Sequence, residues 1–253
     1  MSIGPTMKSI DKVYKSIKKN VKNRISIVKL KLCNPELARV IQFVQKNNLT
    51  YLDADALINL HNAIREVESE HVTGDLIEAG CALGGSSIVM AASKKRERPL
   101  KIFDTFSIIP PPTENDENDS ILRYKTISSG QAVGISGDTY YGYIDGLLGK
   151  VKGSFVSAGY PSGENNVAFI PGLYESSLHL NDPVALAHID CDWYDSVMIC
   201  LTRIVPHLSK GGILVIDDYY HWLGCRNAVD SFFKNALDDF EFIHGARLRI
   251  RKK

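Results

Sequence analysis

The pattern of apolar and polar positions divides the chain into a helical front part and an alternating rear part. From Gly74 onward, short apolar runs alternate with stretches of helical periodicity. This alternation predicts an α/β domain with a mostly parallel, doubly wound sheet over residues 73–253. The predicted strands are 75–79, 100–104, 167–170, 184–190 and 213–217, and the predicted helices lie near 85–95, 194–208 and 225–238.

The end of the chain breaks the alternation. Phe240–His244 and Arg247–Arg251 are two short strand-like runs joined at Gly245. A connection this short forces an antiparallel pair. The sequence therefore predicts a sheet of seven strands that ends in an antiparallel hairpin.

Residues 1–72 are predicted to form a helical, basic extension. Asn34 before Pro35 is typical of a helix start, and another helix is predicted after Asp53. Residues 8–30 carry apolar positions at helical spacing among many lysines, and from Lys8 to Lys31 nine bases face one acid. We favour a solvated helix that packs on the domain or on a partner subunit in a homo-oligomer. The alternative is weak contact with an anionic membrane surface.

Residues 105–166, here called the cover segment, are too many for a plain loop inside a compact domain. They contain three consecutive prolines from Pro110, an acidic cluster over 114–119 and a Tyr/Gly-rich part at 140–146. We expect this segment to contain at least one helix and to act as a mobile cover.

Overall composition is that of an ordinary globular protein, with 44% hydrophobic and 23% charged residues. A formal net charge of +1 gives no nucleic-acid signature. The five cysteines are scattered without a CxxC pair, which favours reduced thiols over a disulfide frame or zinc site. With neither a membrane-length apolar stretch nor a signal-peptide core, the sequence predicts a cytoplasmic protein.

Acidic residues follow two of the predicted strands directly. Asp190 and Asp192 end one apolar run, and Asp217 and Asp218 end another. The carboxyl ends of parallel strands border the crevice where open α/β sheets bind ligands. These acids could instead cap helices or pair on the surface, but converging carboxylates repel one another unless a cation intervenes. We therefore favour a site for Mg²⁺ or a similar divalent cation.

A glycine turn follows the first predicted strand. The sequence around it runs from Glu78 through Gly80 to Gly84, Gly85 and Ser86, and its spacing differs from the dinucleotide fingerprint GxGxxG. Glu78 suits a ligand that carries an ammonium group, and Asp104, at the end of the next strand, is placed to bind ribose hydroxyls. A tight turn and a local cap are the structural alternatives. Together these residues favour an adenosine-type cofactor.

The combined motifs resemble the macrocin O-methyltransferase family. They are EAGxxxGGS, FDTF at Phe103–Phe106, HIDxDxYxS at His188–Ser196, and GGxxxxDDY followed by Trp222 and Ala228-Val229. The resemblance covers roughly residues 74–240. It implies a Rossmann-like class I methyltransferase fold and an enzyme that depends on S-adenosylmethionine and Mg²⁺ and methylates a sugar hydroxyl of a glycosylated natural product or surface glycan.

The resemblance also implies roles for single residues. It assigns the metal to Asp190, Asp217 and Asp218. It assigns the cofactor to Glu78, the turn Gly80–Ser86 with Gly84 and Gly85, Asp104 for the ribose, and the block containing Gly172 near the adenine.

Some members of the family use a histidine of the cover segment as the base, but this chain has no histidine between His71 and His179. That departure places more weight on Asp192 as the general base, with His188 or His221 as alternatives.

Two other functions remain open at this stage. One is a metal-dependent O-methyltransferase that acts on a catechol or another non-sugar diol. The other is a non-catalytic nucleotide-binding protein that docks on a partner or a membrane through its basic helix.

Overall fold

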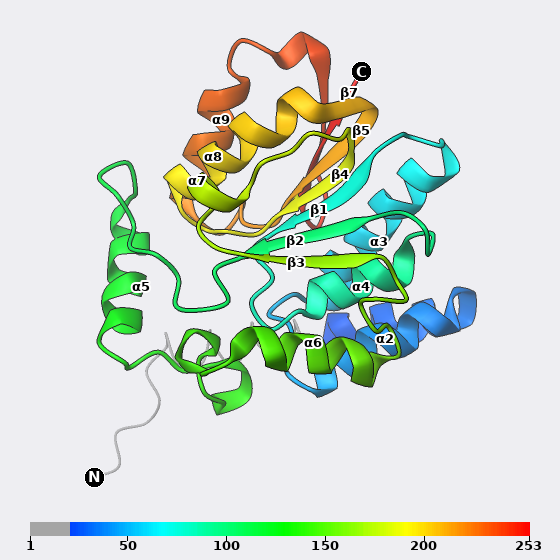
Figure 1. The fold of residues 1–253 in the computed structure, drawn as a ribbon, viewed down its shortest axis with the longest axis horizontal. Helices are drawn as coiled ribbons and strands as arrows, with labels where there is room; N and C mark the ends of the chain where they lie inside the picture. Colours follow the sequence, from blue (N-terminus) through cyan, green and yellow to red (C-terminus); the bar gives the residue numbers. More distant parts are fainter. Residues whose placement is uncertain (1–20) are drawn as a thin grey trace.

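The computed structural model describes residues 21–253, so the part of the basic helix predicted before residue 21 lies outside the described residues. One sheet of seven strands runs through the molecule in the order β3-β2-β1-β4-β5-β7-β6 (Figure 1). The first five of these are parallel, and β7 pairs antiparallel with β5 and β6. This confirms the predicted mostly parallel sheet with its terminal hairpin. The strands are β1 (Asp75–Ala79), β2 (Leu100–Asp104), β3 (Val167–Pro171), β4 (Val184–Ile189), β5 (Leu208–Ile216), β6 (Phe240–Ile243) and β7 (Leu248–Lys252).

Helices cover both faces of the sheet, as buried parallel strands require. In Figure 1, α7, α8 and α9 lie above the sheet, and α2, α3, α4 and α6 lie below it. The alternating side chains of the strands feed two separate hydrophobic clusters, one on each face. The helices are residues 21–33, α2 (Pro35–Lys46), α3 (Ala54–Ser69), α4 (Gly85–Ser93), α5 (Asn118–Ser128), α6 (Leu147–Ala158), α7 (Tyr174–Ser177), α8 (Tyr194–Ile204) and α9 (Leu223–Phe233).

The helical extension packs as part of the domain core. The Asn34 side chain accepts a hydrogen bond from the amide of Leu37 (3.1 Å), which confirms the predicted start of α2. Asp53 caps α3 in the same way, through the amide of Ala56 (3.0 Å). The buried faces of α2 and α3 belong to the same hydrophobic cluster as β1 and α4.

The prediction of a helix up to residue 208 is wrong at its end. Helix α8 stops at Ile204, and β5 already begins at Leu208. Pro206 cannot continue the α-helical hydrogen bonds, so the chain makes a short 3₁₀ turn there. The start of β5 looks like a loop in the sequence because residues 209–212 are Ser-Lys-Gly-Gly. Opposite this part of β5 the strand pairing shifts register, between Val184 and Leu186.

The cover segment contains two helices, as its length predicted. Helix α5 stands at one side of the molecule in Figure 1. Helix α6 instead buries Leu147, Val151 and Phe155 in the core and serves as the crossover between β2 and β3. Residues 105–146 thus border the carboxyl ends of the strands, whereas the rest of the segment packs under the sheet.

The strand order reverses between β1 and β4. At such a reversal the crossover helices leave on opposite faces, which opens a crevice at the carboxyl ends of the strands. Within residues 21–253, every helix is too short or too polar to cross a bilayer.

Candidate active site

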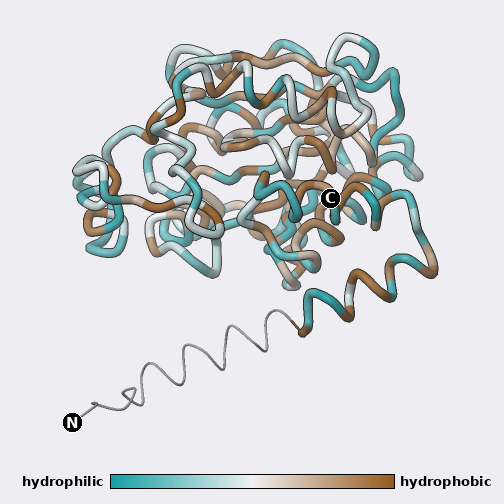
Figure 2. Tube along the Cα trace, turned by 90° about the horizontal axis from the view of Figure 1, so that it is seen from below, coloured by the Kyte–Doolittle hydropathy of each residue, from teal (hydrophilic) through white to brown (hydrophobic). Residues whose placement is uncertain are grey.

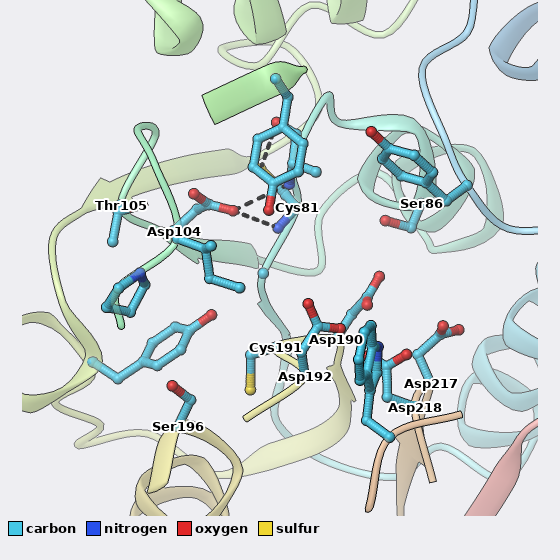
Figure 3. Close-up of a pocket in the computed structure, with 18 of the residues that line it drawn as sticks. Cys81, Ser86, Asp104, Thr105, Asp190, Cys191, Asp192, Ser196, Asp217 and Asp218 are labelled. Atoms are coloured by element: carbon cyan, nitrogen blue, oxygen red, sulfur yellow. Dashed lines mark hydrogen bonds between the residues drawn. The ribbon is translucent and has the colours of Figure 1, made fainter. Parts of the chain in front are cut away.

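A pocket of about 420 Å³ lies at the carboxyl ends of β1, β2, β4 and β5. Residues 105–146 and the loop at 49–52 close it from the side. Figure 3 shows that the acids Asp190, Asp192, Asp217 and Asp218 gather on one side, while Asp104 and Cys81 lie across from them. The pocket therefore has an acidic wall opposite a wall made by the glycine turn.

The glycine turn allows the ends of β1 and β4 to come together. Gly80 has φ +90°, and a Cβ on it would lie 1.9 Å from the carbonyl oxygen of Asp190. Gly85 is required by another contact, because a Cβ on it would lie 2.5 Å from the carbonyl oxygen of Leu49. The amide of Gly85 donates a hydrogen bond to that same oxygen (2.9 Å). The turn is thus clamped between β4 and the extension, with helix α4 starting directly behind it.

The side chain of Asp104 holds this turn by accepting hydrogen bonds from backbone amides. Its Oδ2 accepts hydrogen bonds from the amides of Cys81 (2.7 Å) and Ala82 (3.1 Å), and its Oδ1 accepts from Phe106 (2.7 Å). Ala82 and Phe106 both have positive φ, a backbone conformation that costs energy in non-glycine residues. Burial nevertheless raises the pKa of Asp104 above its usual value. The carboxylate lines the pocket, so its predicted contact with a ribose stays a prediction, alongside this structural role.

Glu78 and His188 form a buried layer behind the pocket. The Glu78 Oε1 accepts a hydrogen bond from the hydroxyl of Ser86 (2.5 Å) and lies 3.1 Å from His188 Nδ1. On the other side of the ring, His188 Nε2 lies 3.7 Å from Asp217 Oδ1. Burial lowers the pKa of His188, but the carboxylates of Asp217 and Glu78 outweigh it and raise this pKa to about 10. His188 therefore lies between two acids that favour its protonated form, and it does not line the pocket.

The acids form two overlapping groups that are each compact enough to hold a cation, and the three predicted ligands Asp190, Asp217 and Asp218 do not fall together in either group. Single oxygens of Asp190, Asp192 and Asp218 all lie within 4.8 Å of one another, and the same holds for the ligand atoms of His188, Asp190 and Asp217. The buried Asp218 Oδ2 has no hydrogen-bond partner among the described residues. An orphaned carboxylate oxygen in a group of hard oxygen donors fits a divalent cation such as Mg²⁺.

The pKa values of the acids in this cluster are raised because several carboxyl groups are buried close together. Burial raises the pKa of Asp190 and that of Asp218, and repulsion from the neighbouring carboxylates raises both further. Burial and the charge of Asp217 likewise raise the pKa of Asp192. Asp192 also has φ +59°, so the chain turns sharply as it leaves β4. A cation would relieve this repulsion.

Asp217 is the exception, and the reason is a residue that the sequence analysis missed. The Nε of Arg247 donates to Asp217 Oδ1 at 2.5 Å. Burial raises the pKa of Asp217, but His188 and Arg247 outweigh it and hold the pKa below its usual value. Arg247 lies just before β7 and lines the pocket with a side chain that is only 11% exposed. Strand β7 pairs with β5, which ends directly before Asp217. Only this antiparallel register reveals that Arg247 lies beside Asp217.

A second set of missed residues forms an aromatic wall. Tyr140 and Tyr141 of the cover segment line the pocket with Tyr51, and the guanidinium of Arg123 lies 5.5 Å from the centre of the Tyr140 ring. The Tyr/Gly-rich composition at 140–146 was a signal for the first two. Nothing in the sequence pointed to Tyr51, because only the packing of the loop at 49–52 on Gly85 brings this residue to the pocket.

The structure brings most of the residues singled out in the sequence to this pocket. Those that line it are Gly80, Ser86, Asp104, Gly172, Asp190, Asp192, Asp217 and Asp218, together with the alternative base His221. Those that lie behind it are Glu78, Gly84, Gly85 and His188. Gly84 is explained by packing, since its Cβ would lie 2.8 Å from a side-chain carbon of Val151 in α6. The roles assigned to all of them remain predictions.

Comparison with known proteins identifies the family of this chain. Residues 46–240 match the family model described as Macrocin-O-methyltransferase (TylF). The demethyldecarbamoylnovobiocin O-methyltransferase of Streptomyces niveus is 27% identical over 196 residues, which cover 74% of this chain and 68% of that protein. The mycinamicin III 3''-O-methyltransferase of Micromonospora griseorubida is 26% identical over 190 residues, covering 72% and 69%.

Solved structures give the same fold. The O-methyltransferase NovP superimposes with a TM-score of 0.66 at 24% identity, over 81% of this chain and 83% of that one. The calicheamicin methyltransferase CalS11 gives a TM-score of 0.57 at 16% identity, over 98% and 94%. The predicted class I methyltransferase fold is thereby confirmed. Because the family model spans most of the chain, this protein belongs to the macrocin O-methyltransferase family and is a methyltransferase.

Proposed function

We propose that this enzyme transfers the methyl group of S-adenosylmethionine to a hydroxyl of a sugar, with the help of Mg²⁺. The observation that carries the proposal is the pocket itself. One wall is the glycine turn at the start of α4, and the opposite wall holds four converging carboxylates. The relatives support a sugar acceptor, because their names describe methylation of glycosylated natural products.

In this proposal the cofactor binds against the turn from Gly80 to Ser86, with its adenosine between Asp104 and the block at Gly172. The backbone amides at the start of α4 and the polar side chains there orient it. The methyl group would then face the acidic wall. Since the sulfonium already activates that methyl group, the enzyme contributes mainly alignment and exclusion of water.

On the acidic wall, Asp190, Asp217 and Asp218 would hold the divalent cation. When bound, that cation would supply the positive charge that favours the deprotonated form of an acceptor hydroxyl. Asp192 takes the proton in this proposal, because it lines the pocket beside the proposed ligands Asp190 and Asp218. His188 holds Asp217 and Glu78 in place from behind. His221 lines the pocket and is the alternative base.

The metal assignment is tested by exchanging single carboxylates for amides of the same shape. Asp190→Asn and Asp218→Asn should abolish Mg²⁺-dependent methyl transfer from labelled S-adenosylmethionine. Cofactor affinity in calorimetry should stay within about threefold, because the side chains of both residues belong to the acidic wall and the substitutions leave the backbone contact between Asp190 and Gly80 in place. Asp195→Asn is the matched control, since Asp195 lies nearby on α8 but binds only Asn115 (3.0 Å). Full turnover of the wild type in a chelator would overturn the metal assignment.

A catechol or other non-sugar diol is the second candidate acceptor. The observation in its favour is the aromatic wall, where the rings of Tyr51 and Tyr141 lie 6.5 Å apart and those of Tyr140 and Tyr141 4.5 Å apart. Aromatic side chains also stack on sugar rings, so the wall suits either acceptor. Labelled methyl transfer onto matched panels of glycosides and catechols separates the two. Turnover confined to catechols would overturn the sugar assignment.

We further propose a cytoplasmic homo-oligomer. All five cysteines are unpaired, which suits a reducing compartment. Light scattering on the purified protein tests the oligomeric state.

A further inference from the structure

The helix formed by residues 21–33 has an inner face that is fixed to the domain. Ile27 and Leu30 are buried against the core. The Asn23 side chain accepts a hydrogen bond from the amide of Ala54 (2.6 Å), and the Ser26 hydroxyl donates to Asp55 (2.5 Å). This face confirms that the basic helix packs on the domain, and it sets the rotation of the helix about its axis.

The opposite face of the same helix is apolar and exposed. Val21, Ile25, Val28 and Leu32, here called the apolar stripe, are 52%, 50%, 60% and 86% exposed. At about 100° per residue, their spacing places all four within an arc of roughly 60°. Figure 2, seen from below, shows the helix as a ridge that stands out from the rest of the molecule. A continuous exposed row of large aliphatic side chains indicates an interaction surface.

Basic residues border the apolar stripe on both sides. On a helical wheel Lys22 and Lys29 lie on one side and Arg24 and Lys31 on the other, each roughly 70–90° from the middle of the stripe. The sequence has no acidic residue between Asp11 and Glu36. A second copy of this helix would therefore bring like charges together along the stripe. Lys22 is paired with Asp55 of the domain (2.7 Å). An anionic surface would be complementary to the other three bases, Arg24, Lys29 and Lys31.

We propose that the apolar stripe and its bordering bases dock this enzyme on an anionic lipid surface. The stripe enters the boundary between headgroups and acyl chains, and the lysines and arginine on either side meet the lipid phosphates. The inner face keeps the domain attached to the docked helix. This docking involves none of the pocket residues, so it stands independently of the proposed acceptor.

The test is cosedimentation of the full chain with vesicles. Wild type should bind vesicles of phosphatidylcholine with 30% phosphatidylglycerol, bind pure phosphatidylcholine far more weakly, and be released by 1 M NaCl. Lys29→Glu with Lys31→Glu should weaken binding by roughly 25-fold or more, since each base near such a surface contributes roughly fivefold. Val28→Ser with Leu32→Ser should weaken it by at least roughly tenfold at unchanged charge.

Matched variants elsewhere separate docking from general effects. Lys150→Glu with Lys234→Glu makes the same change in net charge at exposed sites away from this helix, and Val156→Ser removes a side chain that is 63% exposed on α6. Both should bind vesicles like wild type, and all variants should keep their melting temperature within about 2 °C. No binding to anionic vesicles, or equal loss in the control variants, would overturn the proposal. A dimer that is split by the stripe variant and does not bind vesicles would overturn it in favour of a contact between two copies.

Discussion

Arg247→Gln should destabilise the enzyme strongly, and Mg²⁺ should restore much of the loss. The Arg247 side chain is 11% exposed and that of Asp217 is 6% exposed, so the pair is nearly removed from water. Taking away one partner of a buried ion pair costs about 3–5 kcal/mol, because the remaining charge is left without compensation. For a chain of this size that loss lowers the melting temperature by roughly 10 °C.

A divalent cation at the acidic wall supplies the charge that the variant lacks. At a concentration one hundred times its dissociation constant, the cation adds about 2.7 kcal/mol to the stability of the folded state. The stabilisation by Mg²⁺ should be larger in Arg247→Gln than in wild type by about 1.4 kcal/mol, which corresponds to tenfold tighter binding. Thermal unfolding in a chelator and across a MgCl₂ series measures both quantities.

Arg249→Gln is the control for this experiment. Arg249 lies two residues further along the chain, on β7, but pairs with Glu66 (2.9 Å), a residue that is 27% exposed and outside the pocket. Its loss should cost about 1 kcal/mol or less and should not respond to Mg²⁺. If Arg247→Gln is as stable as this control in a chelator, the buried ion pair between Arg247 and Asp217 does not stabilise the folded state. If Mg²⁺ stabilises both variants equally, the acidic wall is not its site.

Three further predictions concern stability, each measured by urea unfolding. The pKa of half-buried His61 is lowered to about 4 by burial and by Arg65. As the pH falls, the imidazole of His61 therefore takes up its proton in the unfolded state before it does so in the folded state. Wild type should therefore lose about 1–2 kcal/mol more than His61→Gln between pH 6.5 and pH 4, and equal slopes would contradict this. Gly80→Ala should cost more than about 3 kcal/mol, whereas Gly130→Ala, with positive φ and open space around it, should cost about 1 kcal/mol. Asp116→Ala should cost about 1–2 kcal/mol, because its carboxylate accepts the first amide of α8; an unchanged midpoint would show that this cap contributes nothing.

The convergence of the four acids could be predicted from the sequence. Asp190, Asp192, Asp217 and Asp218 each follow an apolar run, and neighbouring parallel strands end at the same edge of their sheet. The same rule placed the Gly80 turn and Asp104 at the same edge of the sheet, across the pocket from the acids. These residues were predictable because local periodicity and one topological rule determine their position.

Other parts of the site depend on tertiary packing and could not be predicted in this way. Arg247 reaches Asp217 only because β7 pairs antiparallel with β5 in one particular register. Tyr51 borders the pocket because the backbone at Leu49 rests on Gly85. The sequence singled out His188 only as an alternative base, and its burial between Glu78 and Asp217 shows that it lies behind the pocket.

The cover segment is tied to the chain immediately after Asp192. The indole of Trp193 donates to the carbonyl of Pro110 (3.0 Å), and the amide of Tyr194 donates to Asp116 (2.8 Å). Outward movement of the cover breaks both bonds, at a cost of about 1 kcal/mol each. The bonds that close the cover are thus also the ones that order the turn at Asp192, the proposed general base, so a variant that opens the cover more easily should also leave Asp192 less ordered.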